Sequence, residues 1–222
     1  MKTSVPSLAW IVVACAALAA CAGFRGGWES VPYVGDTAPT MPEARTAYEA
    51  RQRSELALPG VTLGVGIDNQ TRTYDTQVYL FVLPLSIDPR TVRTRPVEPG
   101  RTRITVRVTG TAGDFVFRPQ RARLVVAGRS VSATGGFEFG MWDAGGKRVA
   151  SGGAWGDRPV PTELALADAA RGYLLSIDFP VPTPDPQSTG IALDLSDALV
   201  APGRPALPLI RFQPARWEEG YT

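Results

Sequence analysis

The side chains that could perform chemistry in this 222-residue chain are few in kind. Histidine is absent, and the two cysteines are Cys15 and Cys21. Without histidine, Ser–His–Asp and Cys–His catalysis and histidine-ligated metals are excluded, and two cysteines cannot build a thiolate zinc site. Paired carboxylates can hydrolyse glycosides, but among 21 Asp and Glu some pair is inevitable and none stands out. The sequence therefore predicts no enzyme, no bound metal and no cofactor.

Cys21 closes a segment with the features of a secretory signal. Lys2 gives a positive start, and an unbroken apolar run follows over residues 8–18. This run is too short to span a bilayer, which takes about twenty apolar residues, and its length fits the hydrophobic region of a signal peptide. The adjoining residues, Leu18-Ala19-Ala20-Cys21, resemble the lipobox of bacterial lipoproteins.

The lipobox resemblance implies that residues 1–20 are cleaved off as a signal peptide and that Cys21 becomes a lipid anchor. The family carries a diacylglycerol on the cysteine sulfur and usually a further acyl chain, such as palmitate, on the new N-terminus. An aspartate after the cysteine often causes inner-membrane retention in this family, so Ala22 implies the outer membrane. The resemblance thus predicts a lipid-anchored protein that faces the periplasm, with exposure at the cell surface left open. An ordinary signal peptide that happens to carry a cysteine, and an uncleaved anchor, are the alternatives.

The first residues of the mature chain predict a linker and not a folded domain. Residues 21–40 are rich in glycine and proline without a periodic apolar pattern, which predicts a flexible tether with a reach of about 25 Å. Residues 41–60 predict a short helix or linker, with a helix over 41–57 that begins at Thr40 as N-cap and ends before Pro59-Gly60. The apolar stripe of this segment is weak, so it could dock on the domain, face a partner or extend the tether.

Residues 61–222 predict a β-domain. Leu63, Val65 and Ile67 alternate with small or polar residues, and residues 103–108 alternate strictly. The run 78–83 is apolar throughout, which favours a central strand buried on both faces. Turn residues recur between the runs at intervals of about 8–12 residues, which is typical of a sandwich. The predicted fold is all-β: a single antiparallel β-sandwich, immunoglobulin-like or related, with one short N-terminal helix.

One segment resembles a known corner. Residues 164–173 are similar to the E-to-F turn of immunoglobulin-like domains, with Asp168 and Tyr173 near the aspartate and tyrosine of that pattern. The resemblance implies that the Tyr173 hydroxyl bonds back to the backbone upstream. A short helix from Glu163 to Ala170, capped by Thr162, is the competing interpretation.

Ten arginines lie between residues 90 and 129. The acidic residues in this stretch are Glu98 and Asp114 alone. Guanidinium groups suit phosphates and carboxylates, here lipopolysaccharide, phospholipid headgroups or an acidic protein surface. The alternative is that basic strands lie beside acidic strands, so that the charges cancel across the sheet. The candidate binding residues in this stretch are Arg93, Arg95, Arg101, Arg103 and Arg107.

A second candidate binding residue is Trp155, which stands in the glycine-rich segment 152–157. Such a tryptophan either forms an exposed platform for a sugar ring or a partner side chain, or folds back to plug the end of the sandwich. The plug is the more common arrangement.

The predicted function is binding or structural. We expect a membrane-tethered accessory subunit that contacts another envelope protein, and the alternative is a binding module for a glycan or an anionic lipid. The near balance of 23 basic and 21 acidic residues gives no reason to expect a nucleic-acid partner.

Overall fold

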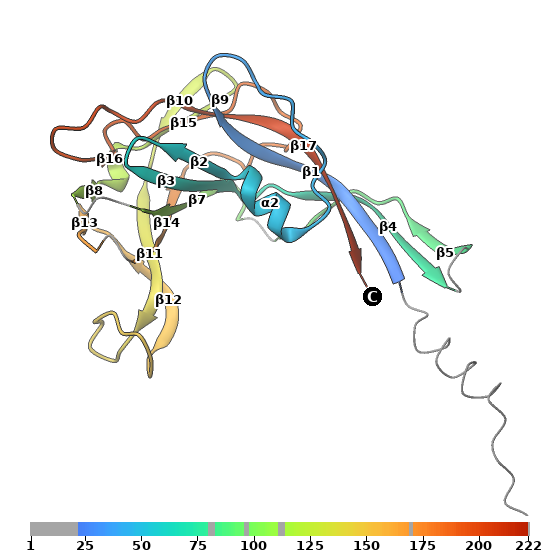
Figure 1. Ribbon diagram of the computed structural model, residues 1–222, viewed down its shortest axis with the longest axis horizontal. Helices are drawn as coiled ribbons and strands as arrows, with labels where there is room; N and C mark the ends of the chain where they lie inside the picture. The colour runs from blue at the N-terminus through green and yellow to red at the C-terminus, as the bar shows by residue number, and fades with distance from the viewer. Residues whose placement is uncertain (1–21, 80–82, 96–97, 111–113, 169–170, 222) are drawn as a thin grey trace, which may run out of the picture.

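The computed structural model describes residues 22–79, 83–95, 98–110, 114–168 and 171–221. Within these residues the chain is all-β, and the strands form three sheets in which all neighbouring strands are antiparallel (Figure 1). This confirms the predicted all-β, antiparallel class. The hydrophobic core draws on all three sheets through side chains such as Leu63, Ile104, Phe117 and Phe212.

The eight-stranded sheet follows the order β10, β9, β15, β17, β1, β4, β5, with β6 also paired to β4. Its strands are β1 (Ala22–Val34), β4 (Thr71–Tyr79), β5 (Leu83–Asp88), β6 (Val92–Arg93), β9 (Arg123–Val126), β10 (Arg129–Ser132), β15 (Ala192–Asp194) and β17 (Ile210–Tyr221). Strands β1 and β17 pair from Gly23 opposite Tyr221 to Val34 opposite Ile210. Both ends of the described chain therefore lie at one end of this sheet, which extends away from the other two sheets (Figure 1).

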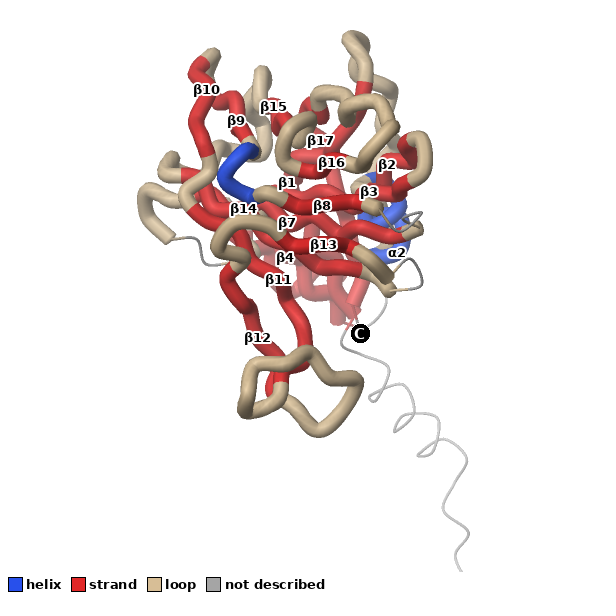
Figure 2. Tube along the Cα trace, turned by 90° about the vertical axis from the view of Figure 1, so that its left-hand side faces the viewer, coloured by secondary structure: helices blue, strands red, loops and turns tan. Residues whose placement is uncertain are grey.

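The six-stranded sheet follows the order β12, β11, β14, β7, β3, β2. Its strands are β2 (Glu55–Leu58), β3 (Val61–Ile67), β7 (Thr102–Thr109), β11 (Gly135–Trp142), β12 (Ala154–Pro159) and β14 (Tyr173–Phe179). Burial alternates residue by residue along β3 and β7, as their sequences predict. Strand β11 pairs with β14 only as far as Phe139, and beyond that residue β11 and β12 continue as a projecting hairpin (Figure 2). Residues 137–159, which form this hairpin and its base in the sheet, are here called the arm.

The three-stranded sheet joins β13 (Leu164–Leu166), β8 (Phe115–Phe117) and β16 (Leu199–Val200), and a short 3₁₀ helix, η1 (Pro119–Arg121), follows β8. The corner behind β13 contains the contact that its sequence implies, because the Asp168 N–H donates to the Tyr173 hydroxyl at 3.2 Å. The competing helix over Glu163–Ala170 is wrong for residues 164–166, which form β13.

The prediction of a flexible tether over residues 21–40 is wrong for residues 22–34, which form β1. The glycines of this strand allow close contacts rather than flexibility. A Cβ on Gly26 would lie 2.5 Å from the Tyr74 hydroxyl oxygen, and one on Gly27 would lie 1.8 Å from the Thr71 carbonyl oxygen. The pairing of β1 with β4 shifts register between these two glycines, because Thr73 is an extra residue in β4, so β4 bulges where it contacts the glycines of β1.

The predicted helix over 41–57 is shorter than expected. Helix α2 spans Ala47–Arg53, and its N-cap is Thr46 rather than Thr40. Thr46 and Glu49 form a capping box, in which each side chain accepts a hydrogen bond from the other's backbone N–H. Residues 55–58 are not helical as predicted but form strand β2, which pairs with β3.

The predicted central strand over residues 78–83 is also wrong. The apolar run covers the end of β4 and the beginning of β5, where Tyr79 lies opposite Leu83. Residues 80–82 lie outside the described part of the chain. β5 ends the strand order of the eight-stranded sheet, so the second part of the run, from Leu83, lies in an edge strand.

Candidate functional site

An exposed aromatic pair is the most prominent feature of the arm. The rings of Phe139 on β11 and Trp155 on β12 stack with centroids 5.6 Å apart and an angle of 14° between their planes. Trp155 is 65% exposed and Phe139 is 37% exposed. The interpretation of Trp155 as a plug is therefore wrong, and the side chain is available as a platform. Phe139 was missed from the sequence, where only its alternation with Phe137 marked it.

Polar contacts hold the other side of the arm. Glu138 is 5% exposed and pairs with both Arg148 and Arg171. The Trp142 indole N–H donates to the Gly156 carbonyl at 2.9 Å, which ties β11 to β12. Charge-assisted bonds at a buried carboxylate are strong, so the arm presents its aromatic pair from a fixed base.

Arg103 on β7 links the arm to the centre of the six-stranded sheet. Its Nε and Nη2 donate to the two carboxylate oxygens of Asp178 at 2.6 and 2.9 Å, and its Nη1 donates to Asp157 of β12 at 2.8 Å. Its guanidinium carbon also lies 4.8 Å from the centroid of the Phe137 ring. The hydrogen bonds that Arg103 donates to Asp178, which is 2% exposed, raise the pKa of Arg103. This arginine positions the arm, and it is already engaged by protein carboxylates.

The register places Trp155, Arg103 and Arg107 on one face of the six-stranded sheet, because directly opposed residues point the same way. The other candidate arginines differ. Arg101 pairs with Glu98 and with Asp178, and Arg95 pairs with Asp68 at 2.9 Å. The alternative, in which charges cancel between strands across the sheet, is therefore observed for Arg103, whose partners Asp178 and Asp157 lie in β14 and β12. Arg95 and Arg101 lie outside the strands but are also paired with carboxylates.

Arg93 lies away from the arm, at a cavity of about 550 Å³ between α2, β6 and the eight-stranded sheet. Arg25 and Arg72 also line this cavity. Arg25 pairs with Glu219 at 2.8 Å, and Arg72 pairs with Asp75 and Asp88. The sequence did not reveal that these three arginines meet, because they come from three separate strands.

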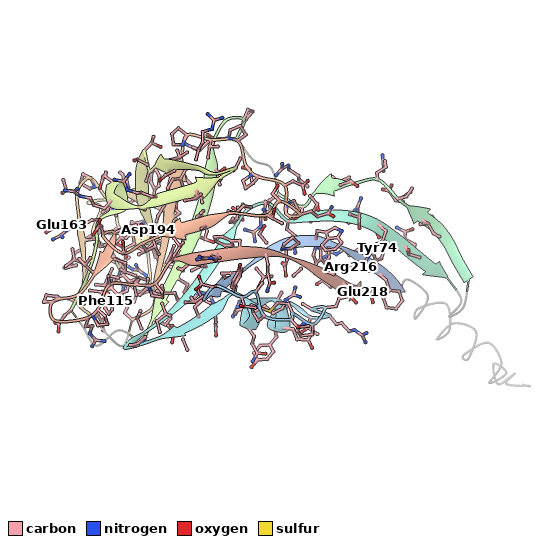
Figure 3. The ribbon with its side chains drawn as sticks, turned by 90° about the horizontal axis from the view of Figure 1, so that it is seen from above. Tyr74, Phe115, Glu163, Asp194, Arg216 and Glu218 are labelled. Atoms are coloured by element: carbon pink, nitrogen blue, oxygen red, sulfur yellow. The ribbon has the colours of Figure 1, made fainter. Side chains whose placement is uncertain are left out.

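A third cluster lies on the extension of the eight-stranded sheet, where Tyr74, Arg216 and Glu218 lie close together (Figure 3). The Tyr74 hydroxyl donates to the Glu218 carboxylate, and the Arg216 guanidinium carbon lies 5.2 Å from the centroid of the Trp28 ring. Burial, followed by the hydrogen bond to Glu218, raises the pKa of Tyr74 to about 12.

Tyr74 gives a direct titration test. Because the folded state favours the neutral hydroxyl, this contribution to stability is present below the ordinary tyrosine pKa of about 10 and is lost as pH rises through about 12. We expect the tyrosinate absorbance of the folded protein to include a step near pH 12 that Tyr74→Phe removes. Persistence of the step in Tyr74→Phe would assign it to another tyrosine.

Two predictions concern the anchor and metals. Cys21 lies outside the described residues. Among the residues that are described, no helix is long and apolar enough to cross a membrane, and no group of three or more His, Cys, Asp or Glu could hold a metal ion.

In comparisons with known proteins, no family model, curated protein or solved structure matches the chain. The candidate site is therefore defined by geometry alone. It is the aromatic pair Phe139–Trp155 on the arm, held in place by Arg103 and Glu138.

Proposed function

We propose that this chain is a bacterial lipoprotein, anchored in the outer membrane through Cys21, that binds another envelope protein with its arm. The exposure of Trp155 in a stacked pair carries the proposal. Tryptophan is enriched among the residues that dominate binding energy at protein interfaces, and large apolar side chains that remain exposed on a projecting element mark interaction sites. The resemblance of residues 18–21 to a lipobox supports the anchor.

The geometry favours a protein partner over a small ligand at the arm. Small-molecule sites are concave, whereas Phe139 and Trp155 are exposed on the two strands of the arm, Phe139 at its base and Trp155 beyond the pairing with β14. Arg103, the candidate arginine that bonds to the arm, is engaged by Asp178 and Asp157. Rigid presentation also lowers the entropy cost of association.

A second candidate function is the binding of a glycan or an anionic lipid, and one observation favours it. The cavity of about 550 Å³ has the size of ligand sites and brings together Arg25, Arg72 and Arg93. Its ligand would have to compete with the carboxylates that already pair with two of these arginines.

We also propose that the sheets form one β-sandwich of immunoglobulin-like or related type. The core shared by the sheets supports this assignment. The bond from the Asp168 N–H to the Tyr173 hydroxyl supports it as well, since a tyrosine bonded to nearby upstream backbone marks the corner of such domains.

The arm is tested by capture from gently solubilised envelopes, with an affinity tag on a linker after Thr222. We expect one protein to co-purify in stoichiometric amount with the wild type. Trp155→Ala should weaken its binding by about 2 kcal/mol, or roughly thirtyfold in Kd, because the platform is lost. Tyr48→Ala is the matched control, since Tyr48 is a 69% exposed aromatic residue on α2, away from the arm.

Equal loss of the captured protein in both variants would contradict a specific role of the arm. Capture that is unaffected by Trp155→Ala but is lost on substitution of Arg93 would favour the cavity as the binding site. Binding of lipopolysaccharide alone, with no protein in stoichiometric amount, would favour the ligand-binding module.

A further inference from the structure

The end of the eight-stranded sheet at which β1 begins has one apolar face. Phe24 lies opposite Thr76, and Thr76 lies opposite Ile87, so these three residues form one row across β1, β4 and β5. Phe24 is 49% exposed and Ile87 is 62% exposed. Two large apolar side chains thus lie uncovered in the same row.

The opposite face of the same sheet end is charged. Arg25 lies opposite both Glu219 and Asp75, and Asp75 lies opposite Asp88. Arg25 pairs with Glu219, and Arg72 pairs with Asp75 and Asp88. The sheet end is therefore amphipathic, with ion pairs on one side and the Phe24–Thr76–Ile87 row on the other.

On the same face, nearer to the body of the molecule, the next residues are aromatic and contact charged side chains. Tyr74 and Glu218 both lie opposite Gly26, and their side chains are bonded to each other. Arg216 lies opposite Trp28 and stacks over its ring. Tyrosine and tryptophan with a polar partner are the residues that favour the headgroup region of a bilayer. The apolar row would therefore lie at the level of the acyl chains, and the aromatic residues at the level of the headgroups.

The proposed lipid-anchor residue, Cys21, is next in sequence to this end of the sheet. Ala22, the first described residue, is already paired with Val78, and Cys21 immediately precedes it. We propose that the Phe24–Thr76–Ile87 face is a membrane-contact surface, on which the sheet end lies against the lipid headgroups and upper acyl chains of the bilayer. This inference rests on the lipid anchor of the proposed function, because the anchor would deliver this face to the bilayer.

Two neighbouring residues provide the test. Thr76 belongs to the apolar face, and Gln77, the next residue, belongs to the charged face. If residues 1–20 are removed and Cys21 carries lipid, the mature chain has no free thiol, so Thr76→Cys and Gln77→Cys can each carry one fluorescent label. The labelled, lipidated proteins are placed in vesicles of phosphatidylethanolamine and phosphatidylglycerol that contain lipids with a nitroxide quencher below the headgroup. We expect the label at residue 76 to be quenched several-fold more than the label at residue 77.

Equal quenching at the two positions would overturn the membrane-contact surface. So would a label at residue 76 that is shielded from both nitroxide lipids and an aqueous quencher, because a second protein copy or a partner would then cover the face. Mass spectrometry of the mature N-terminal peptide tests the anchor separately. If Cys21 proves unmodified, the proposed anchor fails. The comparison is then repeated with Cys21→Ser chains that begin with a histidine tag and are held on nickel-chelating lipids, and the same quenching contrast decides the face.

Discussion

Arg103→Met is expected to lower the free energy of unfolding by about 3 kcal/mol. The substitution keeps most of the aliphatic stem but leaves the carboxylate of Asp178 buried with its bidentate partner removed. Removing one member of a buried ion pair typically costs about 3–5 kcal/mol. We expect the lower end of that range, because Arg103 is partly exposed and Arg101 still lies 3.3 Å from Asp178. Urea denaturation followed by circular dichroism measures the change.

The matched control for Arg103→Met is Arg107→Met. Arg107 has the same residue type, strand and face, and it lies opposite Leu174 rather than a carboxylate. Its substitution should change the free energy of unfolding by less than about 0.5 kcal/mol. Similar losses in the two variants would show that the arginine stems, and not the bonds to Asp178, stabilise the sheet. Recovery in the double variant Arg103→Met, Asp178→Leu would confirm that the isolated carboxylate causes the loss.

Cys21→Ser is expected to abolish attachment of lipid to the protein. A hydroxyl cannot accept the diacylglycerol, and each acyl methylene that is not buried forgoes about 0.8 kcal/mol of membrane affinity. Fractionation of cells that produce the variant should find the unprocessed precursor or a soluble form, with no radiolabelled palmitate incorporated. Cys15→Ser is the control, since Cys15 lies within the predicted signal peptide and its loss should leave lipid incorporation unchanged. Lipid on the Cys21→Ser protein would contradict the assignment of the anchor.

Much of the β-structure could be predicted because its signals are local. The alternation along residues 61–67 and 102–109 gives both the strand and its buried face, and both are found. The contact of Tyr173 with the backbone of Asp168 was likewise implied by a segment of ten residues. Such features depend on neighbours along the chain, which one sequence displays.

The errors concern residues whose partners are distant in sequence. The glycines of residues 22–34 predict a flexible tether, but this segment forms β1, because its partner β17 comes from the other end of the chain. The apolar run 78–83 predicts one buried strand. A hairpin that turns within the run has the same composition, and the pairing of Tyr79 with Leu83 shows that the chain reverses here. No local signal distinguishes these cases.

The candidate site was predicted only in part for the same reason. Trp155 and Arg103 were both singled out, but the sequence could not show that they share a face or that Asp157 joins them. Glycines around Trp155 suit a loop that folds inward as well as a strand that projects. The choice depends on the pairing of β12 with β11 and on the bonds of Arg103, neither of which is visible in the segment itself.

The full-length pairing of β1 with β17 has a mechanical consequence. If the anchor at residue 21 is pulled while a partner holds the arm, the force enters along the axis of β1. It then passes sideways into β17 and β4 through hydrogen bonds that are loaded together in shear, rather than one after another as in unzipping. Because Ala22 is already paired with β4, a lipid on Cys21 would leave no slack segment before the sheet, and little extension would precede this load. Such a chain would transmit tension between the membrane and its partner as a stiff connector.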